Sequence, residues 1–255
     1  WFSPLIQSDS TDKAHQHFTK ESLLKMADNM EQLIEEKYFI NGQYARCVSD
    51  DGTIFGIGET KACKTDVLCQ AFAVLGGKNL LRARTALLKA YRELYDEKNK
   101  LLRLFYPPFT QSTEQGGYIN DYPPFVRENG GQYTHAAVWT AIALIECGES
   151  ELGLKLLSDI NPLERCLTVE AAEVYKNEPY VLSADIYSGD FCGRGGWSWY
   201  TGAASWYSVA IIEHVLGLKF SGSKTIDGEE KYIGSFKCLD IKPVISYTAT
   251  VSLGD

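Results

Sequence analysis

A series of apolar helical segments separated by short turns constrains this fold more than any other feature of the sequence. Residues 133–147 are strongly apolar and end at Gly148, and their partner, residues 149–160, stops at Asn161-Pro162. The same spacing predicts helices over 19–37, 65–75, 79–95, 168–175 and 197–216. About seven helices joined by short turns are typical of antiparallel helix hairpins, so we predict a mainly α fold. A helix bundle and an α/α toroid both fit this pattern.

Three other stretches interrupt the helical pattern. Residues 39–56 contain Asn-Gly and Asp-Gly pairs between alternating residues, which predicts a small hairpin region. Residues 103–131 form a long loop rich in proline and glycine, and loops of this length inside a compact chain are usually functional. From Lys219 onward the residues alternate and are rich in β-branched types, which indicates strands. We therefore divide the chain into a helical part, 1–218, and the start of a β-rich segment, 219–255.

Composition excludes several classes of protein. The net charge is −8, from 25 basic and 33 acidic residues, which argues against a nucleic-acid partner. No apolar run approaches the roughly 18 residues that a membrane helix needs. The seven cysteines form no CxxC pair, which favours free thiols in a reducing, cytoplasmic compartment and argues against zinc or another metal. Because the chain starts with Trp1, we expect the native N-terminus to lie upstream.

The stretch "RENGGQYTHAAVW", residues 127–139, gathers Arg127, Glu128, Asn129, Gln132 and His135 around a Gly-Gly pair. One interpretation is a polar loop with all its hydrogen bonds satisfied and a histidine on the first helical turn. Five hydrogen-bonding side chains beside two glycines, which let a ligand approach the backbone, favour a binding loop instead.

Two further stretches carry candidate residues. In "GRGGWSWYTGAASW", residues 193–206, glycines and Arg194 precede the expected helix, and Thr201 and Gly202 fall in its first turns. Backbone N–H groups, a hydroxyl and a helix N-terminus suit an anion, whereas a glycine-rich turn with core tryptophans is the alternative. In "YKNEPYVLSADIY", residues 175–187, Glu178 and Asp185 are either site carboxylates or solvated and capping ones. No G-x-S-x-G, H-E-x-x-H or dinucleotide fingerprint occurs.

Four motifs in one order carry a resemblance to a known family. "GGYINDYPPFVRENGGQYTHAAVW", "NPLER", "YKNEPYVLSADIYSG" and "GRGGWSWYTGAASWY" resemble the C-terminal part of the catalytic domain of glycoside hydrolase family 94. The family contains inverting phosphorylases of cellobiose and chitobiose and a segment of cyclic β-1,2-glucan synthases. The likeness covers most of residues 38–218. It implies a partial (α/α)6 toroid followed by a short β-rich segment, with residues 221–237 as an insertion.

The resemblance also implies roles for individual residues. The histidine of the YTHA motif and the Thr-Gly of the WYTG motif would hold phosphate, which matches His135, Thr201 and Gly202. The glutamate of the RENG motif would contact the sugar, which matches Glu128, and we add Arg127, Gln132 and Glu178 as candidate substrate-binding residues. Inversion by water needs an acid and a base. Phosphate is already a nucleophile, so groups that position an anion replace the base.

The expected function follows from these matches and one departure. The chain would be part of an inverting glycoside phosphorylase that cleaves a β-linked gluco- or N-acetylglucosaminyl oligosaccharide with inorganic phosphate and gives an α-sugar 1-phosphate. No metal or organic cofactor is implied. The family's general acid, an aspartate in a GDWND-type motif, has no match here, so we expect the chain alone to be inactive without the N-terminal part of the enzyme. Such phosphorylases are often homodimers. The alternative is a non-catalytic carbohydrate- or phosphate-binding module.

Overall fold

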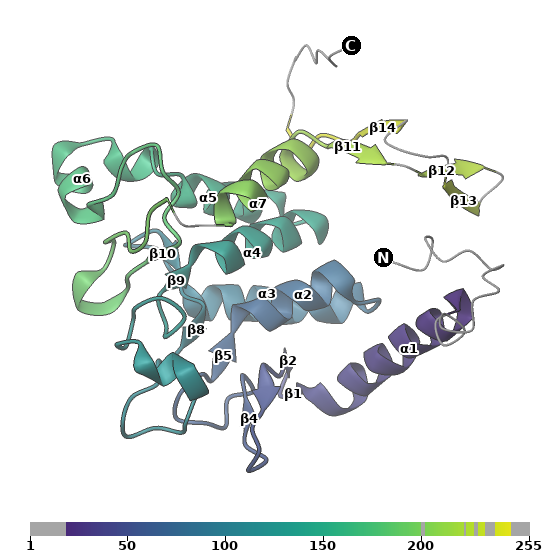
Figure 1. The fold of residues 1–255 in the computed structure, drawn as a ribbon, viewed down its shortest axis with the longest axis horizontal. Helices are drawn as coiled ribbons and strands as arrows, with labels where there is room; N and C mark the ends of the chain where they lie inside the picture. The colour runs from purple at the N-terminus through teal and green to yellow at the C-terminus, as the bar shows by residue number, and fades with distance from the viewer. Residues whose placement is uncertain (1–18, 200–201, 222, 227–228, 233–237, 246–255) are drawn as a thin grey trace.

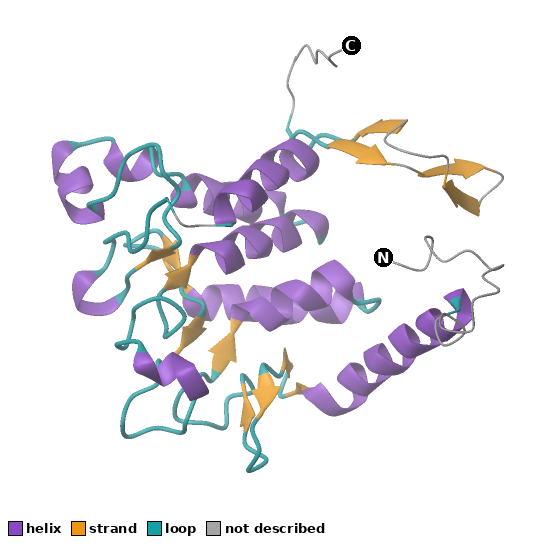
Figure 2. Cartoon of the chain, viewed as in Figure 1, coloured by secondary structure: helices purple, strands orange, loops and turns teal. Residues whose placement is uncertain are grey.

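The computed structural model describes residues 19–199, 202–221, 223–226, 229–232 and 238–245. The fold is mainly α, as the sequence predicts, with short strands between the helices (Figures 1 and 2). The α-helices of the described residues are α1 (Lys20–Leu33), α2 (Val67–Gly76), α3 (Leu80–Leu94), α4 (Thr134–Glu146), α5 (Ser150–Ile160), α6 (Val169–Tyr175) and α7 (Ala203–Val209). Two π-helical turns, Ile34–Tyr38 and Ala210–Val215, extend α1 and α7, and 3-10 turns cover Gly117–Asp121, Glu164–Cys166 and Gly189–Phe191.

Side-chain caps explain where four of these helices begin. The side chains of Thr19, Asp66, Asn79 and Thr168 each accept a hydrogen bond from a backbone N–H in the first turn that follows. Such bonds satisfy N–H groups that have no partner within the helix. Because this information is local, the predicted helix starts lie within two residues of the observed ones at these four positions.

The last long helix is an exception. The sequence predicts a helix from residue 197, whereas α7 begins at Ala203. Trp199 has a positive φ of 62°, which a right-handed helix cannot contain. Residues 197–199 are therefore not helical, and Gly202 stands at the N-cap position of α7 and not within its first turn.

All strands of the described residues pair antiparallel in two-stranded ladders. The region expected to form a small hairpin contains two of them, β1–β2 (Phe39–Ile40 and Gln43–Tyr44) and β3–β4 (Cys47–Val48 and Ile54–Phe55). Within the helical part, β5 (Thr65–Asp66) pairs with β8 (Phe105–Tyr106), β6 (Tyr95–Asp96) with β7 (Leu101–Leu102), and β9 (Gln132–Tyr133) with β10 (Asp185–Ile186). After the helices, β11 (Leu218–Ser221) pairs with β14 (Cys238–Ile241), and β12 (Ser223–Ile226) with β13 (Glu229–Tyr232).

Helix α4 is the centre of the core. Ten of its 13 residues are buried, so it is apolar on all sides, as a core helix must be. It packs against α2, α5 and α7, while α3 packs against α2. By contrast, α1 has no buried residue. Figure 1 shows α2, α4 and α7 running in the same direction, with α3 and α5 returning antiparallel.

The N-terminal ends of these three parallel helices therefore lie at one end of the molecule. Leu104 links two of them, because its carbonyl accepts from Val67 at 3.0 Å and its N–H donates to Gly131 at 2.8 Å. The loops that enter α2, α4 and α7 thus share one edge, which carries most of the candidate residues. The partial (α/α)6 toroid and the division at residue 218 stay predictions.

Candidate functional site

A buried asparagine holds the loop before α4 in one conformation. Asn129 is fully buried, and its Oδ1 accepts from the N–H of Phe109 at 2.7 Å. Its Nδ2 donates to the carbonyl oxygens of Phe109 at 3.0 Å and Tyr122 at 2.9 Å. The next residue, Gly130, has a φ of 84°, a conformation that favours glycine. Asn129 is therefore a structural residue of the polar stretch, and it fixes the backbone that presents its neighbours.

Asp185 joins three segments of the site. Its Oδ2 accepts from the N–H of Arg127, and its Oδ1 from the N–H of Trp197, each at 3.2 Å. The residue pairs with Tyr133 across the β9–β10 ladder and is fully buried, and this burial raises the pKa of Asp185. A Cβ on Gly196 would lie 2.1 Å from Oδ1, so the close approach requires glycine there. Asp185 is a buried structural carboxylate that holds these segments together, and not the solvated or capping carboxylate considered from the sequence.

Arg127 and Glu128 lie together beside Asp185. The Nε of Arg127 is 3.3 Å from the Oε2 of Glu128, and each side chain is 15% exposed. The guanidinium carbon of Arg127 lies 4.9 Å from the ring centre of Trp197 and 5.3 Å from that of Tyr122. Burial, followed by the charge of Glu128, raises the pKa of Tyr133. The charge of Glu128 therefore acts on Tyr133, which directly precedes α4.

His135 lies in the first turn of α4 and is partly buried. Its ring centre is 4.2 Å from that of Trp139 and 6.2 Å from that of Trp206. Burial lowers the pKa of His135, so the neutral imidazole is favoured near pH 7. Its Nε2 is buried and has no hydrogen-bond partner among the described residues. An unpaired buried nitrogen is costly unless another group binds there.

Gly202 lies against the ring of His135. A Cβ built on Gly202 would be 3.3 Å from Cε1 and 3.7 Å from Nδ1 of His135, so the backbone before α7 and the imidazole are neighbours. Thr201, the third residue expected to hold phosphate, lies outside the described residues. Two of the three expected phosphate residues are thus adjacent, although they come from distant parts of the sequence.

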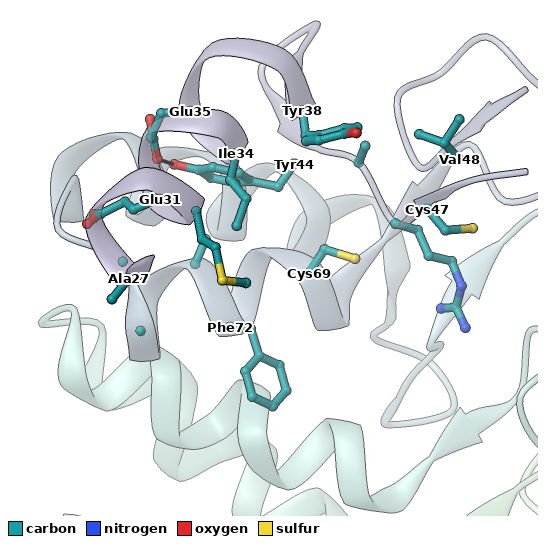
Figure 3. A pocket seen from close by; sticks show the side chains of 16 residues that line it. Ala27, Glu31, Ile34, Glu35, Tyr38, Tyr44, Cys47, Val48, Cys69 and Phe72 are labelled. Atoms are coloured by element: carbon teal, nitrogen blue, oxygen red, sulfur yellow. Dashed lines mark hydrogen bonds between the residues drawn. The ribbon is translucent and has the colours of Figure 1, made fainter. Parts of the chain in front are cut away.

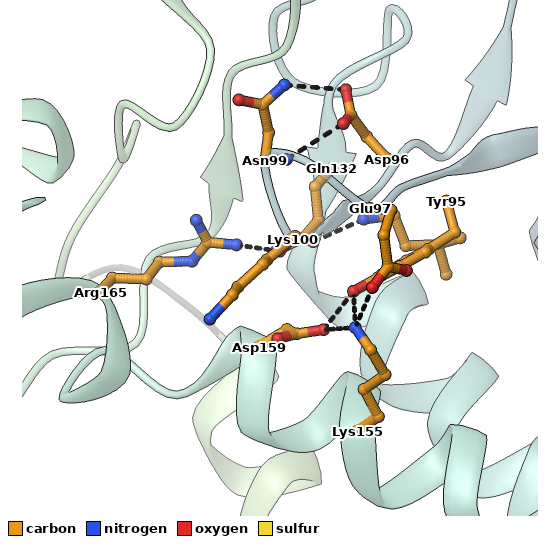
Figure 4. A network of polar contacts seen from close by, with 10 residues as sticks. Tyr95, Asp96, Glu97, Asn99, Lys100, Gln132, Lys155, Asp159 and Arg165 are labelled. Carbon is orange, nitrogen blue, oxygen red and sulfur yellow. Dashed lines mark hydrogen bonds and ion pairs between the residues drawn. The ribbon is translucent and has the colours of Figure 1, made fainter.

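Gln132 lies elsewhere. It is fully buried, and its Oε1 accepts from the N–H of Leu102 at 2.9 Å. Successive residues of a strand point to opposite faces, so Gln132 points away from the face of Tyr133. Figure 4 shows it in a network of polar residues that also includes Lys155 and Asp159, whose Nζ and Oδ2 lie 3.1 Å apart. The structure gives Gln132 a role in holding the β6–β7 hairpin.

Glu178 and Arg194 contact aromatic residues other than those around His135. The Oε1 of Glu178 accepts from Nε1 of Trp199 at 2.8 Å, which holds an indole that is 71% exposed. Arg194 is exposed, and its guanidinium carbon lies 5.9 Å from the ring centre of Tyr187. A Cβ on Gly195 would lie 2.6 Å from Asn177, so this glycine, like Gly196, serves close packing. The glycines before α7 therefore have a structural explanation, as in the alternative interpretation of that stretch.

Sequence patterns missed several members of the site. Tyr133, Trp139 and Trp206 surround the glutamate and the histidine, yet nothing distinguishes them from ordinary core aromatics in the sequence. Thr134 is buried at the start of α4, and its Oγ1 has no partner among the described residues. Its position directly before His135 is the signal that could have indicated it.

The described residues contain no group of three or more His, Cys, Asp or Glu side chains that could hold a metal ion. In the same part of the chain, no helix is long and apolar enough to cross a membrane. Cysteines 47, 63, 69, 147, 166 and 192 are free thiols. A cavity of about 780 Å³ lies between α1 and α2 beside Ile34 and Phe72, and none of the candidate residues lines it (Figure 3).

Comparison with known proteins covers most of the chain. The cyclic beta-(1,2)-glucan synthase NdvB of Rhizobium meliloti (strain 1021) is 39% identical over 202 residues, which are 77% of this chain and 7% of that protein. An N,N'-diacetylchitobiose phosphorylase of Vibrio furnissii is 25% identical over 70% of this chain and 22% of its own length. A cellobionic acid phosphorylase of Neurospora crassa is 24% identical over 70% of this chain and 23% of its own length.

The chain thus spans less than a quarter of these three relatives. The family model described as the glycosyl hydrolase 94 superfamily, catalytic domain, matches residues 7–217, which confirms the resemblance drawn from the four motifs. The chain belongs to the glycosyl hydrolase 94 superfamily.

Proposed function

We propose that this chain forms the phosphate- and sugar-binding part of an inverting glycoside phosphorylase. The whole enzyme would cleave a β-linked glucan with inorganic phosphate and release an α-sugar 1-phosphate. The observation that carries the proposal is the contact between the His135 ring and Gly202. These residues belong to the two motifs that the family resemblance connects with phosphate.

The electrostatics around His135 support an anion at this point. Its Nε2 is buried and unpaired within the described residues, and its pKa is lowered by burial, so a neutral imidazole can donate one N–H. The positive end of the α4 dipole lies at the same place, and this helix has 13 residues. Together these donors suit phosphate without requiring a fixed cation.

The reaction assigns distinct tasks to the phosphate and to an acid. A phosphate oxygen attacks the anomeric carbon from the face opposite the leaving sugar, the glycosidic C–O bond breaks, and the leaving oxygen takes a proton from a general acid. Both oxygens of Asp185 already accept backbone N–H groups, so Asp185 positions the site and does not act as this acid. We assign the acid to a part of the enzyme outside these 255 residues.

The surroundings of Glu128 and Glu178 suit a sugar. Glu128 offers a carboxylate to hydroxyl groups. Tyr180 and Trp199 are each 71% exposed, with ring centres 6.2 Å apart, and exposed aromatic rings can stack on the apolar face of a pyranose. Since the relative at 39% identity is named for cyclic β-(1,2)-glucan, we propose β-1,2-linked glucosyl chains as the substrate.

The test is an assay for sugar 1-phosphate. The 255-residue chain and the full product of its gene are each incubated with phosphate and with sophorose, laminaribiose, cellobiose or chitobiose. We expect release from sophorose by the full product alone, and loss of that release in His135→Ala. A protein that binds sugar or phosphate but releases no product from any of the four would be the non-catalytic binding module. Sustained release by the isolated chain would mean that one of its own carboxylates is the acid.

A further inference from the structure

A second cavity lies at the shared edge, near α2. Its volume is about 500 Å³, and it is enclosed by the β3–β4 hairpin, the first turn of α2 and the loop at 115–119. Residues that line it include Arg46, Ser49, Phe55, Phe109, Gln115 and Tyr118. We propose that this cavity is a second sugar subsite, which takes a neutral glucosyl ring of a longer oligosaccharide. The inference rests on the proposed function and extends it to the length of the substrate.

The lining matches the two kinds of surface that a pyranose presents. Among the lining residues, the rings of Phe55 and Phe109 pack at 5.5 Å, and Tyr118 is 67% exposed, which provides aromatic surface. Ser49 and the exposed Gln115 also line the cavity and bring hydroxyl and amide groups that can meet sugar hydroxyls. A mostly apolar hollow with a few polar groups is the usual form of a small-molecule site, and the volume is ample for one hexose.

The charge of the cavity favours a neutral ligand. Arg46 is the one charged residue among those that line it, and it forms an ion pair with Asp66, which is fully buried. The guanidinium carbon of Arg46 also lies 5.4 Å from the ring centre of Phe105, which fixes its place. Because Asp66 already neutralises Arg46, an acidic sugar would find little uncompensated positive charge here. A neutral glucosyl ring fits better.

The cavity and the site at Glu128 share one apolar wall. Tyr133, which follows the Glu128 loop directly before α4, packs against the buried cluster that contains Phe55, Phe109 and Ile119, and these three residues line the cavity. The electrostatic influence of Tyr118 also reaches Tyr133. A chain bound at Glu128 can therefore continue past Tyr133 toward the cavity, which a disaccharide would not reach.

The experiment measures binding without reaction. Without phosphate, phosphorolysis cannot occur, so calorimetry can give the affinity of the 255-residue chain for β-1,2-linked glucose oligomers of two to five units. We expect a step of about three- to tenfold tighter binding when the chain becomes long enough to fill the cavity. Tyr118→Ala and Gln115→Ala should each reduce this step and leave the affinity for the disaccharide unchanged. Phe191→Ala is the control, because Phe191 is 66% exposed and does not line the cavity.

Every outcome bears on the proposal. A length-dependent step that both variants reduce and the control keeps would support it. Absence of the step, persistence of the step in the two variants, or equal loss in Phe191→Ala would overturn it. An oligomer oxidised to an aldonic acid that binds more tightly than the neutral one, through Arg46, would overturn the neutral assignment. Product release is measured separately, so an enzyme that binds by length but releases nothing would refute the proposed function alone.

Discussion

Replacing Asp185 by alanine tests whether this buried carboxylate holds the site together. Its two hydrogen bonds, to the N–H groups of Arg127 and Trp197, are each 3.2 Å long, at the long end of the normal range. At about 1.5 kcal/mol for a long bond to a charged group, the pair contributes about 3 kcal/mol. The burial that raises the pKa of Asp185 opposes this gain. We therefore expect Asp185→Ala to lower the free energy of unfolding by about 2 kcal/mol.

The matched variant Asp185→Asn separates shape from charge. It keeps one acceptor oxygen and removes the buried charge, so we expect a smaller loss, about 1 kcal/mol. In a chain of this size, the two losses correspond to decreases in Tm of about 4–8 °C and about 2–4 °C. Thermal unfolding followed by circular dichroism measures both, and Asp190→Asn, at an exposed position in the same region, should leave Tm unchanged.

The pH dependence provides the refutation. Because the pKa of Asp185 is raised in the folded state, folding favours the protonated carboxyl, and the stability linked to this protonation is fully present below the unfolded pKa of about 3.9. That contribution is lost as pH rises through the folded pKa. Relative to the non-titrating Asp185→Asn variant, the wild type should lose stability as pH rises from about 4 through the raised pKa of Asp185. A wild type that gains stability over that range would mean that the two N–H donors outweigh burial, and the reasoning would fail.

Three further predictions concern other parts of the molecule. His135→Ala should weaken phosphate binding by about tenfold or more in calorimetric titration, and His135→Gln, which keeps an N–H donor, should recover part of the loss. Arg46→Met should destabilise the fold by about 3–5 kcal/mol in denaturant unfolding, because the negative charge of Asp66 stays buried without its ion-pair partner. Adding Asp66→Asn removes that charge and should recover part of the loss. Hydrogen bonds from His214 and then Lys219 lower the pKa of Glu146 to about 2, so the stability advantage of wild type over Glu146→Gln should shrink as pH falls from about 4.5 to 2.

Local signals explain what the sequence could predict of the fold. Thr19, Asp66 and Thr168 cap helices by bonding to N–H groups two or three residues away, so the helix starts can be found in the sequence. The segment before α7 could not be found in this way. Its tryptophans and small residues have helical spacing, but Gly196 is placed against Asp185, which lies in another segment, and Trp199 takes a positive φ. Tertiary contacts therefore override the local pattern there.

The same distinction applies to the candidate site. The sequence grouped Asn129, Gln132 and His135 because they are polar and close together, and polarity alone cannot tell which of them faces a ligand. The structure shows that Asn129 is fully buried with its side-chain oxygen and nitrogen both bonded to backbone groups. The Oε1 of Gln132 is bonded to backbone as well, while the buried Nε2 atoms of Gln132 and His135 have no partner within the described residues. Fewer residues of the motif are therefore available to bind a ligand than its composition indicates.

The arrangement of the helices separates stability from binding. Because α2, α4 and α7 begin at one end of the molecule, the loops that enter them lie there. The residues of these loops fall into two groups, buried and exposed. Asn129 and Asp185 are fully buried and bond to backbone groups, so their replacement acts on stability first and on ligands only through the loops they hold. Tyr118 is exposed and does not belong to the core, so its replacement should change the affinity for the ligand and leave Tm unchanged. A variant series in which binding and Tm always fell together would contradict this division.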